Sequence, residues 1–163
     1  MNKKNFFGFT LIELLIVIAI LAILASLISN NFITSLKKGR DAKRKSDLEQ
    51  IKNALEMFYE DKKRYPSSLQ FGGKLCENTC IAGEKVYMQL VPKDPLTTGN
   101  YQYQTDTNGT YFRVFSCIEN VNDTSSNVSQ TGYSGGPTNC GTGVCAICKY
   151  TISSTNIAPL PTP

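Results

Sequence analysis

Gly8-Phe9-Thr10-Leu11-Ile12-Glu13 leads into a nearly unbroken apolar run that extends from Leu14 to Ile28. A helix of about 20 apolar residues is long enough to span a bilayer. Residues 9–28 reach that length, so the sequence predicts a transmembrane helix there. Glu13 then becomes an acid within a membrane segment.

Glu13 is the unusual residue of this segment. An ionised carboxylate deep in hydrocarbon costs about 3 kcal/mol, so such a group usually has a partner and a function. The alternative is that Glu13 lies at the membrane interface and extends its side chain towards water. The four-residue distance from Phe9 and the short basic leader before it favour a partner.

Gly8, Phe9 and Glu13 together resemble the signal sequence of type IV prepilins and pseudopilins. The resemblance implies cleavage between Gly8 and Phe9 by prepilin peptidase, methylation of the new Phe9 amine, and pairing of Glu13 with an N-terminus. That amine would supply the positive charge that Glu13 needs in a medium of low dielectric. Phe9 and Glu13 are also i and i+4 neighbours, so pairing within one subunit and pairing between subunits both remain open.

A basic cluster follows the apolar run and consists of Lys37, Lys38, Arg40, Lys43, Arg44 and Lys45. Positive charges next to a membrane span favour the cytoplasmic side, so this cluster alone would place the C-terminal end of the span in the cytoplasm. The prepilin-like leader with Lys3 and Lys4 instead places the N-terminus there. We expect the cluster to contact lipid headgroups, or acids of adjacent subunits such as Asp47 and Glu49. We predict no nucleic-acid binding, because Asp41 interrupts the cluster and no aromatic residues alternate with it.

Beyond Ile28 the helix becomes amphipathic, since Leu48, Ile51, Leu55 and Phe58 recur at spacings of three and four. Oppositely charged residues four apart, such as Lys45 and Glu49, form the solvated face. A single helix is predicted from about residue 9 to residue 62, before the Tyr65-Pro66 break.

The remainder predicts a small antiparallel sheet. Strand-like alternation over 101–104 and 111–115, around the turn 106–109, indicates a hairpin, and 150–152 a last short strand. The predicted fold is α+β and pilin-like, a long helix packed on this sheet. Its predicted parts are a cleaved cytoplasmic leader (1–8), a transmembrane and assembly helix (9–28), its amphipathic continuation (29–65), a cysteine-containing globular head (66–155) and a flexible proline-rich tail (156–163).

Six cysteines in a chain with an export signal favour disulfides outside the cytoplasm. Their spacing leaves all 15 pairings open. Cys145 and Cys148 have the spacing of a redox motif, and with Cys76 and Cys80 they offer a four-thiolate zinc site. Structural disulfides are the favoured interpretation for the candidates Cys76, Cys80, Cys117, Cys140, Cys145 and Cys148.

Histidine is absent, which excludes a Ser-His-Asp triad and histidine-ligated zinc within this chain, so we expect no enzyme. The segments 92–95 (Pro-Lys-Asp-Pro) and 101–103 (Tyr-Gln-Tyr) resemble the core of the major pseudopilins of type II secretion, although Leu96 stands where those proteins usually carry tryptophan. That resemblance implies calcium in the loop after the hairpin, with Glu119, Asn122 and Asp123 as candidate ligands. No other cofactor is expected.

The resemblance thus implies a structural subunit of a type IV pilus or a type II secretion-like pseudopilus. Its expected partners are further copies of itself, prepilin peptidase, the assembly machinery of the inner membrane and, before assembly, the lipid bilayer. It would be a single-pass inner-membrane protein with its C-terminal domain outside the cytoplasm, and then part of a cell-surface or periplasmic filament. The alternative is a bitopic membrane protein whose cysteine-rich ectodomain binds metal or exchanges disulfides.

Overall fold

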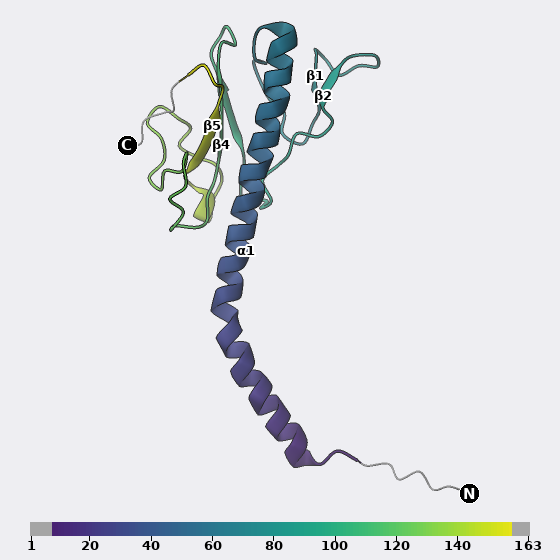
Figure 1. Cartoon of the computed structure of the whole chain (residues 1–163), viewed down its shortest axis with the longest axis vertical. Coiled ribbons are helices and arrows are strands. Elements are labelled where there is room, and N and C mark those ends of the chain that lie inside the picture. The colour runs from purple at the N-terminus through teal and green to yellow at the C-terminus, as the bar shows by residue number, and fades with distance from the viewer. Residues whose placement is uncertain (1–7, 158–163) are drawn as a thin grey trace, which may run out of the picture. The chain divides into compact units, whose positions relative to one another are not determined.

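The computed structural model describes residues 8–157, apart from the side chains of residues 27–31. The predicted leader except Gly8, and most of the predicted tail, lie outside the described residues. The described residues form a long helix, five strands and a short 3-10 helix (Figure 1). The chain divides into two compact units, one up to Leu36 and one from Lys37 onward.

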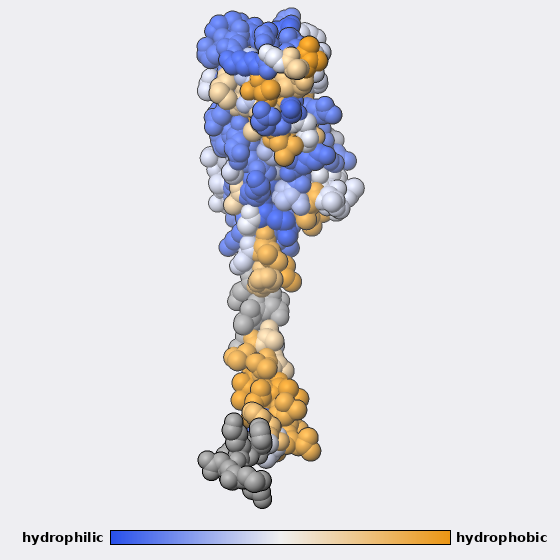
Figure 2. Space-filling model, turned by 90° about the vertical axis from the view of Figure 1, so that its right-hand side faces the viewer, coloured by the Kyte–Doolittle hydropathy of each residue, from blue (hydrophilic) through white to orange (hydrophobic). Residues whose placement is uncertain are grey.

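Helix α1 (Leu11–Lys62) has residues in both units and confirms the predicted helix to within two residues at its start. In the first unit its large apolar side chains are 45–88% exposed, and they form the apolar surface of this unit in Figure 2. Within residues 8–157, no helix combines the length and the apolar character that crossing a membrane requires.

The C-terminal end of α1 is a backbone cap. Lys63 follows the helix with φ 55°, and its N–H donates to the Tyr59 carbonyl oxygen at 2.7 Å. This is the single hydrogen bond of a left-handed helix cap, which satisfies a carbonyl that would otherwise lack a partner. Pro66 then disfavours helical geometry at Tyr65.

The core of the second unit lies between α1 and a three-stranded sheet. Leu48, Ile51 and Leu55 are buried together with Phe112 and Val114, as the helical spacing of the apolar residues predicts. Each fully buried side chain of this size contributes about 1.5–3 kcal/mol. The predicted packing of the helix on a small antiparallel sheet is confirmed.

The sheet has the order β3-β4-β5, with β3 (Gln102–Thr105), β4 (Phe112–Ser116) and β5 (Tyr150–Ser153), and both pairings are antiparallel. Val114 is paired with Tyr103 on one side and with Ile152 on the other. The predicted hairpin and the predicted last strand are both present.

A second, two-stranded sheet was not predicted. It pairs β1 (Leu75–Cys76) with β2 (Val86–Met88), and the 3-10 helix η1 (Gly143–Cys145) was also missed. Strands this short carry too few residues to show a period of two. This two-stranded sheet packs on α1 through Tyr87 of β2 and Phe58 of the helix, whose ring centroids are 5.1 Å apart.

Candidate functional site

The start of α1 is built by Thr10 and Glu13. Thr10 precedes the first helical residue, and its N–H and hydroxyl both donate to Glu13 Oε2, at 2.9 Å and 2.7 Å. The Glu13 N–H donates back to Thr10 Oγ1 at 3.3 Å. This reciprocal arrangement is a capping box, which satisfies backbone donors that the first helical turn leaves without partners.

The predicted cleavage site lies directly before this cap. Gly8 and Phe9 are outside the helix, Phe9 is 85% exposed, and a Cβ placed on Gly8 would meet nothing within 4 Å. An exposed, non-helical peptide is the kind of segment that a peptidase can bind. In the uncleaved chain the Phe9 nitrogen belongs to a peptide bond, so the pairing of Glu13 with a Phe9 amine stays a prediction.

The apolar surface of the first unit continues directly from this cap. Exposed apolar patches of more than a few hundred Å² usually mark an interaction site. The exposed large side chains of the segment include Leu11, Ile12, Leu14, Leu15, Ile16, Val17, Ile18, Ile20, Leu21, Ile23 and Leu24. These residues therefore form a surface suited to burial against other apolar groups.

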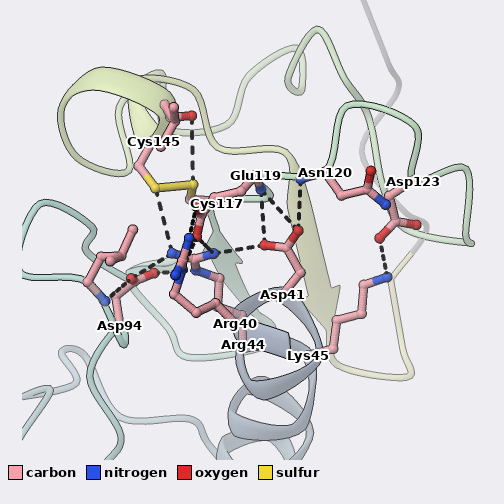
Figure 3. Close-up of polar contacts among 12 residues, drawn as sticks. Arg40, Asp41, Arg44, Lys45, Asp94, Cys117, Glu119, Asn120, Asp123 and Cys145 are labelled. Atoms are coloured by element: carbon pink, nitrogen blue, oxygen red, sulfur yellow. Dashed lines mark hydrogen bonds and ion pairs between the residues drawn. A yellow bond between two sulfur atoms is a disulfide. The ribbon is translucent and has the colours of Figure 1, made fainter. Parts of the chain in front are cut away.

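The second unit contains a buried ionic cluster, which we define as Arg40, Asp41, Arg44, Asp94 and Glu119 (Figure 3). Arg44 is its centre and is fully buried. Its guanidinium donates to both oxygens of Asp94, at 2.8 Å and 2.9 Å, and to Asp41 and Glu119, each at 2.8 Å. Arg44 Nη2 also lies 3.8 Å from Cys145 Sγ.

The cluster connects α1 to segments far away in the sequence. Asp94 lies in the loop between β2 and β3, and Glu119 follows β4. Arg40 adds a second bidentate pair, donating to the two oxygens of Glu119 at 2.7 Å and 2.6 Å. Asp41 accepts from the backbone N–H groups of Glu119 and Asn120, at 2.8 to 3.1 Å. Two cations thus hold three carboxylates, and one of these carboxylates, Asp41, also holds the backbone that follows β4.

Glu119 and Arg44 stabilise each other's charged forms. Hydrogen bonds from Arg40 and, despite burial, from Arg44 lower the pKa of Glu119 from 4.5 to about 2. Burial opposes the charge on Arg44, but its hydrogen bonds to Asp94 and Glu119 raise the pKa of the guanidinium further. Both groups therefore stay charged at neutral pH.

The predicted external role of the basic cluster is contradicted for Arg44, whose side chain is fully buried, and stays a prediction for its other five residues. Arg40 and Arg44 belong to the buried ionic cluster, Lys43 binds the buried Asp47 at 2.6 Å, and Lys45 binds Asp123 at 2.6 Å. Asp47, which was expected to meet an adjacent subunit, also accepts a hydrogen bond from the Tyr101 hydroxyl at 3.0 Å. Lys43 and Asp47 lie four residues apart on α1, but helical periodicity could not reveal the other contacts, because Asp94, Glu119 and Asp123 lie outside this helix.

The three calcium candidates are divided between different contacts. Glu119 binds the two arginines, whereas Asp123 binds Lys45 and the hydroxyl of Ser125. Burial raises the pKa of Asp123, but hydrogen bonds from Lys45 and Ser125 together outweigh this effect and the pKa falls to about 2. Asn122 is exposed, and its N–H donates to Asn120 Oδ1 at 3.3 Å. Among residues 8–157, no group of three or more Cys, Asp or Glu residues is arranged to hold a metal ion.

The cysteines form three disulfides, Cys76–Cys80, Cys117–Cys145 and Cys140–Cys148. Cys145 pairs with Cys117 and Cys148 pairs with Cys140, so the two do not form a redox pair with each other, and the redox-motif interpretation of their spacing is wrong. With all six sulfurs in disulfides, the four-thiolate zinc site is also contradicted. The favoured interpretation as structural disulfides is confirmed.

Sequence reasoning missed Thr10, Asp41 and Asp94 as site residues. Thr10 had a local signal, because a threonine three residues before a glutamate is the pattern of a capping box. Asp94 lay within the quoted Pro-Lys-Asp-Pro segment, but no local pattern connects it to Arg44, 50 residues earlier.

Two families match this chain. Residues 3–29 match the prokaryotic N-terminal methylation motif, and residues 31–130 match type II secretion system protein G. No solved structure matches the chain.

Proteins similar to this chain are named as core proteins of type II secretion or as a type IV pilin. The chain is 37% identical to type II secretion system core protein G of Aeromonas hydrophila over 58% of this chain and 71% of that protein. It is 35% identical to the core protein G of Vibrio cholerae over 63% of this chain and 72% of that protein. A shorter match, 41% identical, covers 39% of this chain and 29% of the type IV major pilin PilA of Myxococcus xanthus. The methylation motif and the match over 31–130 show that this chain belongs to the protein G family of type II secretion systems.

Proposed function

We propose that this chain is a structural subunit of a type II secretion pseudopilus, made as a precursor and polymerised through its apolar N-terminal helix. Prepilin peptidase cuts the precursor between Gly8 and Phe9 and methylates the Phe9 amine. The match over residues 31–130 favours a pseudopilus over a type IV pilus, because the similarity to the Myxococcus pilin covers a smaller part of the chain.

The observation that carries this proposal is the exposed apolar surface of α1 between Leu11 and Leu24. Keeping one such side chain out of water contributes about 1.5–3 kcal/mol, so the whole surface has to be covered by lipid or by other apolar helices. Lipid covers it before assembly, and the equivalent helices of other copies cover it in the filament.

The location of the subunit follows from the exchange of lipid for neighbouring helices around its apolar surface. Before assembly it is a single-pass protein of the inner membrane, with its C-terminal domain outside the cytoplasm. After assembly it belongs to a periplasmic filament. Its partners are further copies of itself, prepilin peptidase, the bilayer and the assembly machinery of the inner membrane. We propose a role in assembly, with no catalytic step and no nucleic-acid ligand.

Glu13 sets the register of assembly in this proposal. In the precursor its carboxylate is held by the Thr10 cap. Cleavage creates a positive amine on Phe9, and an ion pair in a medium of low dielectric is strong when the geometry is good. Exchange of the local cap for the amine of a neighbouring copy would align successive subunits.

The rival function, a cysteine-rich ectodomain that binds metal or exchanges disulfides, has no observation in its favour. It requires thiolates, but all six cysteines are in disulfides, four of them fully buried.

The proposal is tested by Glu13→Ala in the full-length chain. We expect this variant to be cleaved and methylated normally, with Phe9 at the mature N-terminus in a mass spectrum, but to be absent from sheared filaments. Glu60→Ala is the matched control, since Glu60 is a largely exposed acid on the same helix. Filament yield like that of the control would refute the assigned role of Glu13, and a mature chain that retains residues 1–8 would refute the proposed processing.

A further inference from the structure

The segment that follows β4 is held by charged side chains of α1, three of them cations and one a carboxylate. Arg40 and Arg44 bind Glu119, Asp41 binds the backbone of Glu119 and Asn120, and Lys45 binds Asp123 (Figure 3). This is the segment in which the family resemblance implies a calcium ion, so the oxygen atoms present can be compared with what calcium needs.

Calcium takes six to eight oxygen ligands, drawn from carboxylates, carbonyls and water. Here the carboxylate oxygens already accept charged donors. Glu119 Oε1 accepts from Arg40 and Arg44, and Glu119 Oε2 accepts from Arg40 at 2.6 Å. Asp123 Oδ2 accepts from Lys45, and Asp123 Oδ1 accepts from the N–H and hydroxyl of Ser125.

Carbonyl oxygens of the same segment are also occupied. The Gln130 amide donates to the carbonyl oxygens of Asn120 and Asp123, at 3.2 Å and 3.0 Å. A calcium ion would therefore displace two guanidinium groups, an ammonium group and an amide. Arg40 and Arg44 both contact the Glu119 side chain, which has almost no exposed surface, so their removal would be costly.

We propose that Arg40, Arg44 and Lys45 replace a divalent cation in this chain, so that folding of the unit from Lys37 onward is independent of calcium. Arg44 is especially suited to this role because a guanidinium has five N–H donors in a fixed plane. Its donors are distributed over Asp94, Asp41, Glu119 and the sulfur of Cys145, which joins three carboxylates and a disulfide.

Replacing a bound calcium ion by arginine and lysine side chains removes the dependence of stability on the free calcium concentration. A bound ion stabilises a protein by mass action, so its contribution varies with the free ion concentration. A cation that is covalently part of α1 has no such dependence. The segment after β4 would keep its structure when calcium is scarce.

The test compares thermal unfolding of the full chain, purified in a non-ionic detergent, with excess EGTA and with excess calcium chloride. We expect the two Tm values to agree within about 1 °C, and metal analysis to find no stoichiometric calcium. A filled site at about 100 times its Kd would instead raise Tm by about 5 °C or more. A calcium-dependent rise of that size, or one bound calcium per chain, would overturn the proposal.

A pair of variants tests the role of the cations themselves. Lys45→Met removes the partner of Asp123 from a partly exposed position, so the variant is expected to fold. Lys52→Met, on the same helix and outside these contacts, is the control. We expect Lys45→Met to lower Tm by about 3–5 °C relative to the control, equally in EGTA and in calcium. Equal Tm values for the two variants, or rescue of Lys45→Met by calcium to the control value, would contradict the proposal.

Discussion

Arg44 and Asp94 form a bidentate ion pair in which both side chains are fully buried, although 50 residues separate them in sequence. The two bonds, Nε to Oδ2 at 2.8 Å and Nη2 to Oδ1 at 2.9 Å, join α1 to the loop before β3. Asp94 Oδ1 also accepts the N–H of Leu96 at 2.8 Å, so the carboxylate orients its own loop. This pair couples the helix to the loop that leads into the sheet.

Loss of this pair should destabilise the second unit strongly. Arg44→Met leaves buried carboxylates without their cation, and breaking a buried pair from one side costs about 3–5 kcal/mol. Urea unfolding followed by circular dichroism measures the change. Lys63→Met is the control, because Lys63 and its partner Glu60 are both largely exposed, and such a pair contributes about 0–1 kcal/mol. A cost for Arg44→Met no larger than that of the control would mean that the ionic cluster does not stabilise the fold.

Stability should decrease in acid through Glu119. Its folded pKa, lowered to about 2, lies below its ordinary value of 4.5, so its contribution is present above pH 4.5 and is lost as pH falls towards 2. The groups that face it are Arg40, Arg44 and the acid Asp41. We expect a loss of about 2–3 kcal/mol over this range, measured as the urea midpoint at successive pH values. Glu119→Gln should have a flatter dependence on pH between 4.5 and 2, and an unchanged slope would contradict this assignment.

The start of α1 should depend on the hydroxyl of Thr10. Thr10→Val keeps the size of the side chain but removes the acceptor for the Glu13 N–H, and loss of such a cap costs about 0.5–2 kcal/mol. Hydrogen exchange of the backbone amides in the first turn after Leu11 should become faster. Thr10→Ser retains the hydroxyl and should exchange like the natural chain. Equally slow exchange in Thr10→Val would show that the cap does not hold this helix end.

The disulfides should contribute unequally. Cys117–Cys145 closes a sequence separation of 28, whereas Cys76–Cys80 closes a separation of only 4. Loop-closure entropy predicts that the longer bridge stabilises the chain by about 1.5 kcal/mol more than the shorter one. Replacing each pair by two alanines and comparing the free energies of unfolding tests this difference. A larger cost for the shorter bridge would show that effects other than chain entropy dominate.

The elements that depend on neighbouring residues were predictable. Leu48, Ile51, Leu55 and Phe58 predicted the buried face of α1 because helix geometry places residues three and four apart on one side. The hairpin of β3 and β4 followed from alternation around a turn containing Gly109, whose φ of 65° suits glycine. The strands β1 and β2 escaped because two or three residues give no readable period.

The candidate sites show the same division between local and distant information. Glu13 was identified from one stretch of chain, because a carboxylate within an apolar run is anomalous wherever the chain folds. Lys45, in contrast, has Glu49 four residues away but binds Asp123. Arg44, on the same helix, has a guanidinium that the fold buries completely. The cysteine pairing likewise required knowledge of which loops meet.

By itself, the sequence determined where the helix lies, which of its faces is apolar, and where the chain carries a processing signal, because each of these depends on interactions between residues close along the chain. Only the tertiary structure decided which carboxylates surround Arg44 and which cysteines join, because distances between remote segments depend on how the whole core packs. An ion pair or a disulfide forms only when that packing brings its two atoms within a few ångströms.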